Sequence, residues 1–263
     1  MPYRIDLARP PADALDRLVR LGALDVDRTE AGVAAILPDH VSRDEAASVL
    51  GVARLTVSAA VGRDDDSVWV LAPRAVRVGP LVIAPAGVDA AADAVRLVDA
   101  PAFGTGLHPT TALCLEALAD EITGASPAVV LDVGTGSGIL AIAALRLGAG
   151  TAIGLDTDAA ALATAEANAR LNGVASRLRL VHGGPEACTD VVPLVLANIL
   201  AAPLIEMAPT LVRRLGHHGR VVLSGIAESV GAQVRETYTR LGLRLVREET
   251  RAGWMLLVLE AQW

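Results

Sequence analysis

The sequence predicts an α/β protein with a doubly wound, mostly parallel sheet, preceded by a small ferredoxin-like α+β domain. From residue 111 onward, helical patterns alternate with continuous apolar runs such as AVVLDVG (128–134), which are typical of buried parallel strands. Near the N-terminus the expected order is strand, helix, strand, strand, helix, strand, the order of a split βαβ unit. The last segment, LRLVREETRAGWMLLVLEA (243–261), predicts a β-hairpin that adds an antiparallel strand to the sheet.

Short periodic segments separated by turn residues define the expected N-terminal unit. Its second helix has the clearest end signals, with Ser42 as N-cap, Glu45 at the capping-box position and Gly51 as the stop. The expected strands are YRIDL (3–7), ALDVDR (23–28), GVAAILP (32–38) and ARLTVSAAV (53–61), and the expected helices are PPADALDRLVRLG (10–22) and SRDEAASVLG (42–51).

Composition shifts divide the chain into three parts. Residues 1–62 form the ferredoxin-like domain, which is more typical of a docking module than of a catalytic one. Residues 63–95 contain an acidic run followed by spaced prolines and glycines, and predict a linker with a short β element. Residues 96–263 form the large α/β domain, with strands expected at 128–134, 151–156, 178–183, 192–200 and 220–226, and helices at 111–122, 139–149, 159–173, 203–216 and 229–242.

Composition also limits the function. The 263 residues are 52% hydrophobic and carry a net charge of −7, which argues against a broad nucleic-acid-binding surface. No apolar run is long enough to span a membrane, and the N-terminus lacks a signal-peptide pattern. Two cysteines are too few for a disulfide scaffold. We therefore expect a cytoplasmic monomer that requires neither a membrane nor nucleic acid.

A glycine turn is the strongest motif. Gly134-Thr135-Gly136-Ser137-Gly138 follows an expected strand and precedes an expected helix, where backbone N–H groups can hold a ligand. Asp156 ends the next strand and is placed to accept hydrogen bonds from ribose hydroxyls. The G-x-G-x-G spacing differs from the G-x-G-x-x-G of dinucleotide sites, so another nucleotide-like cofactor is favoured.

These residues also carry a resemblance. LDVGTGSGILAIAALRLGA (131–149) and IGLDTD (153–158) resemble motifs I and II of class I S-adenosylmethionine-dependent methyltransferases, which have a Rossmann-like fold. AFGTGLHPTT (102–111), ANILAAPLIEMAP (197–209) and LSGI (223–226) are similar to the bacterial family that methylates ribosomal protein L11. The resemblance implies S-adenosyl-L-methionine as cofactor and ribosomal protein L11 as protein substrate.

The resemblance also implies which residues bind the cofactor. They come from the segment at the start of the large domain, the glycine turn, and the ends of two strands. They are Phe103, Gly104, Thr105, Thr111, Gly134, Gly136, Asp156 and Asn198, with His108 in the same loop as the first three.

Asn198 is the leading catalytic candidate. Its position resembles the polar residue of the N-P-P-aromatic motif of amine methyltransferases, here replaced by Asn198-Ile199-Leu200-Ala201. An amide oxygen there can accept a hydrogen bond from the attacking amine and aim its lone pair. His108 is the candidate base by residue type. The alternative, which we favour, is a histidine that hydrogen-bonds the backbone and holds the loop.

Other reactive residue types receive structural interpretations. We expect His217 and His218 to lie in a solvated turn and to bind no metal. Cys114 and Cys188 should pack as small hydrophobic residues. Asp158 is expected at the surface or as a helix N-cap.

Three functions remain open. The first is methylation of lysine ε-amines, the N-terminal α-amine or both on ribosomal protein L11, with the N-terminal domain docking the substrate. The second is methylation of another protein lysine, as in enzymes that modify the electron-transfer flavoprotein β subunit. The third is binding of S-adenosylmethionine without catalysis. A single Trp69 stands where the L11 family has a tryptophan-rich connector, which leaves the substrate less certain than the chemistry.

Overall fold

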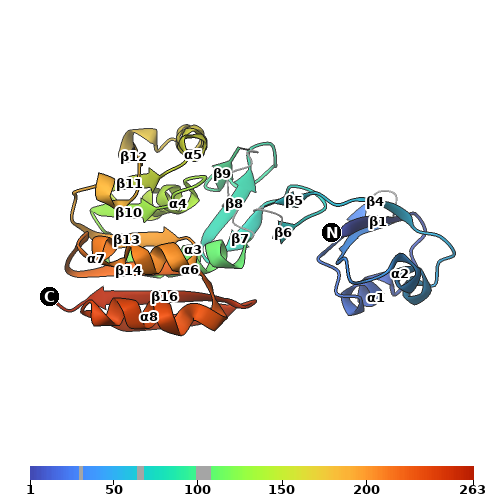
Figure 1. Cartoon of the computed structure of the whole chain (residues 1–263). Helices are drawn as coiled ribbons and strands as arrows, with labels where there is room; N and C mark the ends of the chain where they lie inside the picture. The colour runs from blue at the N-terminus through green and yellow to red at the C-terminus, as the bar shows by residue number, and fades with distance from the viewer. Residues whose placement is uncertain (30–31, 64–67, 99–107) are drawn as a thin grey trace. The chain divides into compact units, whose positions relative to one another are not determined.

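The chain folds into two compact units. The computed structural model describes residues 1–29, 32–63, 68–98 and 108–263 (Figure 1). The units are Met1–Pro73 and Arg74–Trp263. Residues 74–95 of the expected linker therefore belong to the large unit. Within the described part of the chain, no helix is both long and apolar enough to cross a membrane.

The small unit has the expected ferredoxin-like topology. Its antiparallel sheet has the order β2-β3-β1-β4. The Ser42 hydroxyl accepts a hydrogen bond from the Glu45 N–H at 3.1 Å, and Gly51 ends the helix with a φ of 68°. Both end signals read from the sequence are thus confirmed. The elements are β1 (Tyr3–Leu7), α1 (Ala14–Arg20), β2 (Asp25–Thr29), β3 (Gly32–Leu37), α2 (Arg43–Leu50) and β4 (Thr56–Ala59).

The small unit has a core of its own. Alternate residues of β1 and β3 face the helices, because successive side chains of a strand point to opposite faces. The buried cluster consists of Ile5, Leu7, Leu18, Leu21, Val33, Ala35, Leu37, Val41, Ala46 and Leu50.

Two small sheets account for the expected β element of the connector. One pairs β5 (Gly62–Arg63) with β6 (Val68–Trp69) in the small unit. The other belongs to the large unit and has the order β7-β8-β9. Its strands are β7 (Val76–Val78), β8 (Leu81–Pro85) and β9 (Val95–Leu97).

The large unit is built on a seven-stranded sheet with the order β12-β11-β10-β13-β14-β16-β15. The first five strands in this order pair in parallel, and β16 is antiparallel to both of its neighbours. The expected doubly wound sheet with a closing hairpin is confirmed. The strands are β10 (Val129–Val133), β11 (Thr151–Asp156), β12 (Leu178–His182), β13 (Val192–Asn198), β14 (Leu215–Ala227), β15 (Leu243–Arg251) and β16 (Trp254–Ala261).

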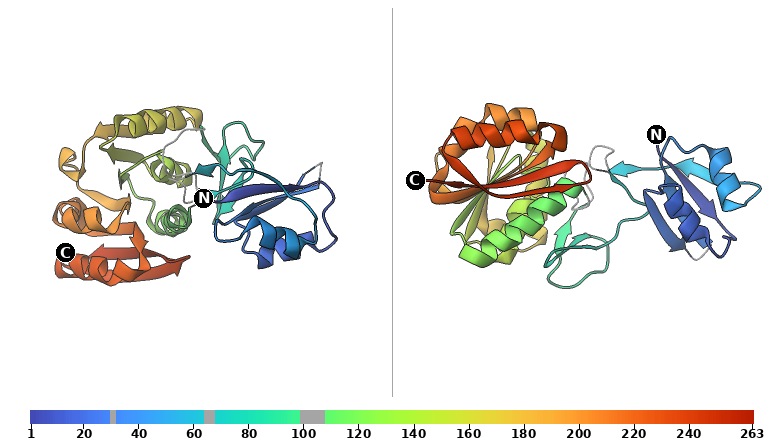
Figure 2. Two further views of the ribbon diagram at one scale, coloured as in Figure 1. Left: turned by 45° about the vertical axis from the view of Figure 1, so that its right-hand side comes forward. Right: turned by 90° about the horizontal axis from the view of Figure 1, so that it is seen from below.

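Helices cover both faces of this sheet, and each face has its own buried cluster. The right-hand view of Figure 2 shows α3 and α8 on opposite sides. Helices α3 (Pro109–Ala125), α4 (Ile139–Leu147) and α5 (Ala159–Leu171) lie on one face. Helices α6 (Ala201–Glu206), α7 (Ala208–Val212) and α8 (Gly231–Arg240) lie on the other.

Several expected boundaries differ from the structure by a few residues, and two expectations differ in kind. The single helix expected over 203–216 is two short helices that meet at Met207, because Pro209 has no N–H and its ring excludes a continuous helix. His217 and His218 lie within β14 rather than in a turn before it. They occupy an irregular part of the strand, where His218 has a φ of 53°, and both are exposed as expected.

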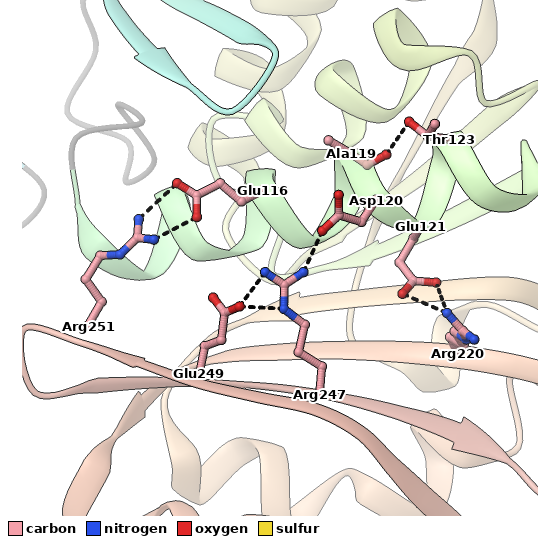
Figure 3. Close-up of polar contacts among 9 residues, drawn as sticks. All are labelled: Glu116, Ala119, Asp120, Glu121, Thr123, Arg220, Arg247, Glu249 and Arg251. Atoms are coloured by element: carbon pink, nitrogen blue, oxygen red, sulfur yellow. Dashed lines mark hydrogen bonds and ion pairs between the residues drawn. The ribbon is translucent and has the colours of Figure 1, made fainter.

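Ion pairs join α3 to strands β14 and β15. Glu116 lies one turn before the adjacent pair Asp120 and Glu121, and the three acids bind Arg251, Arg247 and Arg220, respectively (Figure 3). The Arg220 guanidinium also contacts Glu260, and the side chains of Glu121 and Glu260 are only 14% and 16% exposed.

Replacing Arg220 should destabilise the large unit, because Arg220→Met leaves two poorly solvated carboxylates side by side. We expect a loss of about 2 kcal/mol in the free energy of unfolding. Arg240→Met is the matched control, because the Arg240–Glu236 pair is exposed on one helix and contributes under about 0.5 kcal/mol. Equal losses in a urea titration of the two variants would show that the Arg220 contacts are energetically ordinary.

Candidate active site

The glycine turn connects β10 to α4 and is fixed to the neighbouring strand β11. Gly134 and Gly136 have φ angles of 70° and 54°, a region that favours glycine. The N–H groups of Gly134 and Thr135 both donate to the Leu155 carbonyl at 2.9 Å. These N–H groups therefore hold the turn in place and do not face a ligand, which corrects the expectation from the sequence. The half-buried surfaces of Gly134 and Gly136 are what the turn offers to a ligand.

Asp156 ends β11 beside this turn, as expected. Its Oδ2 accepts a hydrogen bond from the Gly136 N–H at 2.9 Å, and its Oδ1 accepts one from the Asp158 N–H at 3.0 Å. Each carboxylate oxygen can accept a second hydrogen bond. Asp156 therefore organises the turn and keeps acceptor capacity for two hydroxyl groups. Asp158 is the N-cap of α5, as expected, and accepts from the Ala160 N–H at 2.8 Å.

Asp132 is a site residue that the sequence analysis did not single out. It lies near the end of β10, is 1% exposed, and its Oδ2 accepts hydrogen bonds from the Thr135 hydroxyl (2.7 Å) and the Ala141 N–H (3.3 Å). Burial raises its pKa to about 6, although those two hydrogen bonds act in the opposite direction. Its Oδ1 is buried and has no hydrogen-bond partner among the described residues. The position of this aspartate two residues before the glycine turn is the feature of the sequence that could have identified it.

Asn198 and Thr111 meet across the site. Asn198 is the last residue of β13, and Thr111 lies in the first turn of α3 with no exposed surface. The Asn198 Nδ2 donates to the Thr111 hydroxyl at 3.3 Å. This contact orients the amide so that Oδ1 points elsewhere, and Oδ1 is buried without a hydrogen-bond partner in the described part of the chain. A buried acceptor left open in this way is rare in folded proteins and marks a place for a donor.

His108 caps helix α3. Its Nδ1 accepts a hydrogen bond from the Thr110 N–H at 3.3 Å and lies 2.7 Å from the Thr110 hydroxyl. The ring packs edge-on against Trp254, with ring centroids 5.2 Å apart, and is 4% exposed. The hydrogen bond to the backbone agrees with the structural role that we favoured. It also explains why α3 begins at Pro109, two residues earlier than expected.

Ile199 connects the acceptor strand to the glycine turn. A Cβ on Gly134 would lie 2.4 Å from the Ile199 Cγ2, and a Cβ on Gly225 would lie 2.3 Å from the Ile199 carbonyl oxygen. The Ile199 N–H donates to the Ser224 carbonyl at 3.1 Å. Only glycine at 134 and 225 allows this approach, so the residue after Asn198 is held from both sides.

The structure thus gathers Thr111, Gly134, Gly136, Asp156 and Asn198 at the carboxyl ends of β10, β11 and β13, where open α/β sheets bind ligands. Cys114, in α3, is a buried free thiol, and burial raises its pKa. Cys188 is also free and buried. The expected cofactor contacts of Phe103, Gly104 and Thr105 lie outside the described residues.

The sheet has five parallel strands, and the antiparallel β16 lies between β14 and β15. A glycine turn follows β10, and an acidic residue ends β11. Together these features define a class I methyltransferase fold. The sequence profile described as ribosomal protein L11 methyltransferase (PrmA) matches residues 46–262. The chain belongs to this family.

Named relatives agree with this assignment. A ribosomal protein L11 methyltransferase from Myxococcus xanthus is 38% identical over 226 residues, which cover 83% of this chain and 76% of the relative. One from Methylococcus capsulatus is 43% identical over 157 residues, or 59% of this chain and 52% of the relative. The crystal structure of a ribosomal protein L11 methylase from Lactobacillus delbrueckii subsp. bulgaricus matches with a TM-score of 0.66 and 31% identity, covering 72% of this chain and all of that one.

The site fits S-adenosylmethionine, the cofactor of this class. Gly134 and Gly136 are only half-buried, so part of the turn's surface is accessible to a ligand. Asp156 can accept further hydrogen bonds from ribose hydroxyls, and the unpaired Oδ1 of Asn198 provides an acceptor at the end of β13. These three features come from adjacent strand ends.

The pKa of Asp132 predicts a specific pH dependence. Its carboxyl has a pKa near 3.8 in the unfolded chain and about 6 in the folded protein. Below pH 4 the carboxyl is neutral in both states, and its contribution to the free energy of unfolding is fully present. That stabilisation is lost as the pH rises through 6, and the loss is about 3 kcal/mol. Asp132→Asn stays neutral, so its free energy of unfolding relative to the original protein should increase by about that amount between pH 4 and 7.5.

Chemical denaturation at a series of pH values measures this difference, and other titrating groups cancel between the two proteins. A difference that stays constant with pH would mean that Asp132 is ionised throughout, and the assignment of a raised pKa would be wrong.

Proposed function

We propose that the chain transfers methyl groups from S-adenosylmethionine to amines of ribosomal protein L11, on lysine side chains, on the N-terminal α-amine or on both. The open Oδ1 of Asn198 is the observation that carries this proposal. It is an acceptor with no donor among the described residues, at the strand end where the methyl group would be delivered. An incoming amine supplies that donor.

Asn198 performs the positioning step. The Thr111 contact at 3.3 Å occupies the amide nitrogen, which leaves the oxygen to accept an N–H from the amine. The amine lone pair is thereby aimed along a fixed direction. S-adenosylmethionine, when bound, supplies an activated methyl group whose transfer releases a neutral thioether. Because the leaving group is already activated, orientation of the amine accounts for much of the rate enhancement.

His108 is poorly placed to accept a proton from the amine. Its Nδ1 is committed to the cap of α3, so the neutral ring carries its proton on Nε2. In this tautomer the ring holds the first turn of α3, and with it Thr111. We therefore assign His108 a positioning role and leave the departing proton to solvent.

The N-terminal unit is our candidate for docking the protein substrate. It has its own core and a topology typical of binding modules, and the small unit lacks the cofactor residues gathered at the large sheet. We propose that it binds ribosomal protein L11, that the enzyme acts as a monomer in the cytoplasm, and that it requires no nucleic acid. The named relatives favour the ribosomal protein over the electron-transfer flavoprotein β subunit as substrate.

Intact-protein mass spectrometry tests the function. The purified chain, S-adenosylmethionine and ribosomal protein L11 should yield L11 heavier by whole methyl groups, and the flavoprotein subunit should stay unmodified. Residues 74–263 alone should still bind S-adenosylhomocysteine but lose most activity on intact L11, because the docking unit is missing. Methylation of the flavoprotein subunit in place of L11 would assign the alternative substrate. Cofactor binding with neither product would indicate a non-catalytic protein.

A further inference from the structure

Asn168 in α5 and Asn172, the C-cap residue of this helix, are buried one helical turn apart. The two residues are 0% and 9% exposed, respectively. A buried amide is costly unless its donors and acceptor are hydrogen-bonded. Both side chains are satisfied, and all of their partners are backbone groups.

The two amides pair with the free edge of β9. Asn172 exchanges two hydrogen bonds with Arg96, from its Nδ2 to the carbonyl at 2.7 Å and from the Arg96 N–H to its Oδ1 at 2.8 Å. The Oδ1 of Asn168 accepts from the Val98 N–H at 2.7 Å. Four helical residues rise about 6 Å and two strand residues about 6.6 Å, so the two spacings match. The helix thus replaces a neighbouring strand along this edge.

Asn168 makes one contact that Asn172 does not. Its Nδ2 donates to the Ser137 carbonyl at 2.8 Å, within the glycine turn. The second hydrogen bond donated by the Asn172 Nδ2 goes to the backbone carbonyl of Asn168 in α5, at 2.8 Å. One side chain therefore links the cofactor turn to the end of β9, while the other holds β9 alone.

We infer that Asn168 is a positioning residue for S-adenosylmethionine, which it serves by fixing the Ser137 end of the glycine turn. Leu155 and Asp156 hold the beginning of that turn from β11, and Asn168 holds its end from α5. With both ends fixed, the surfaces of Gly134 and Gly136 are ordered before the cofactor arrives. This assignment rests on the cofactor of the proposed function but not on its protein substrate.

Calorimetric titration with S-adenosylhomocysteine tests the inference in full-length protein. Asn168→Ala should raise the Kd about tenfold, since a hydrogen bond that orders the turn is lost. Asn172→Ala is the matched control, because it loosens β9 to a similar degree and leaves the turn tethered. It should lower the melting temperature while changing the Kd less than about twofold.

Asn168→Asp separates the two contacts of one side chain. The aspartate oxygen still accepts from Val98 N–H, but it cannot donate to Ser137 and repels its carbonyl oxygen. We expect the Kd to rise at least as much as in Asn168→Ala, with a larger loss of melting temperature, because a buried carboxylate is costly. Titrating each variant well below its own melting temperature keeps the comparison valid if one of them is less stable.

Equal effects of Asn168→Ala and Asn172→Ala on the Kd would overturn the inference, as would an unchanged Kd in Asn168→Asp. Failure of the proposed function gives a different pattern. In that case the original protein binds S-adenosylhomocysteine, and the variants weaken it as expected, but ribosomal protein L11 is not methylated.

Discussion

The site depends on the close approach of three backbone segments around Ile199. The Ile199 side chain lies over Gly134, and its carbonyl lies against Gly225, at distances that a Cβ at either glycine would forbid. Protein interiors are close-packed, so a segment confined on both sides has one position. Because Asn198 directly precedes this residue, the location of the acceptor strand end follows from the glycine turn and from β14. The cofactor and acceptor halves of the site are in this way one packed unit.

Hydrogen bonds around this unit are distributed unevenly among its buried polar side chains. The amides of Asn168 and Asn172 are satisfied by backbone groups, as buried amides normally are. The amide of Asn198 is satisfied only on its nitrogen, and Asp132 has one open oxygen. Native proteins tolerate few such open atoms. Their presence at the carboxyl end of the parallel sheet is consistent with a site organised to receive donors from ligands.

The sequence predicted most of the architecture because strong periodicities and end signals decide it. The parallel strands, the hairpin and the Ser42 cap all follow from local pattern. Contacts between distant segments do not follow from it, and neither the role of Asp132 nor the link from Asn168 to Ser137 was predicted. The assumed N–H cradle was wrong for the same reason, because the Leu155 carbonyl that takes those donors lies on another strand. Family resemblance assigned Thr111 and Asn198 to the same cofactor site, and their contact with each other is seen in the structure alone.

The most direct test of this account is single-turnover methyl transfer to ribosomal protein L11 by Asn198→Ala, at saturating S-adenosylmethionine and on protein confirmed as folded. Removal of a group that orients the amine should lower the rate by roughly 100-fold, with a smaller effect on cofactor affinity. Ser224→Ala is the control, because Ser224 is paired with Asn198 in the sheet and its hydroxyl donates to the Met255 carbonyl at 3.0 Å. It should lower stability and retain the rate per folded molecule. A decrease of less than about threefold in Asn198→Ala would contradict the account, because the amine would then be held by other groups.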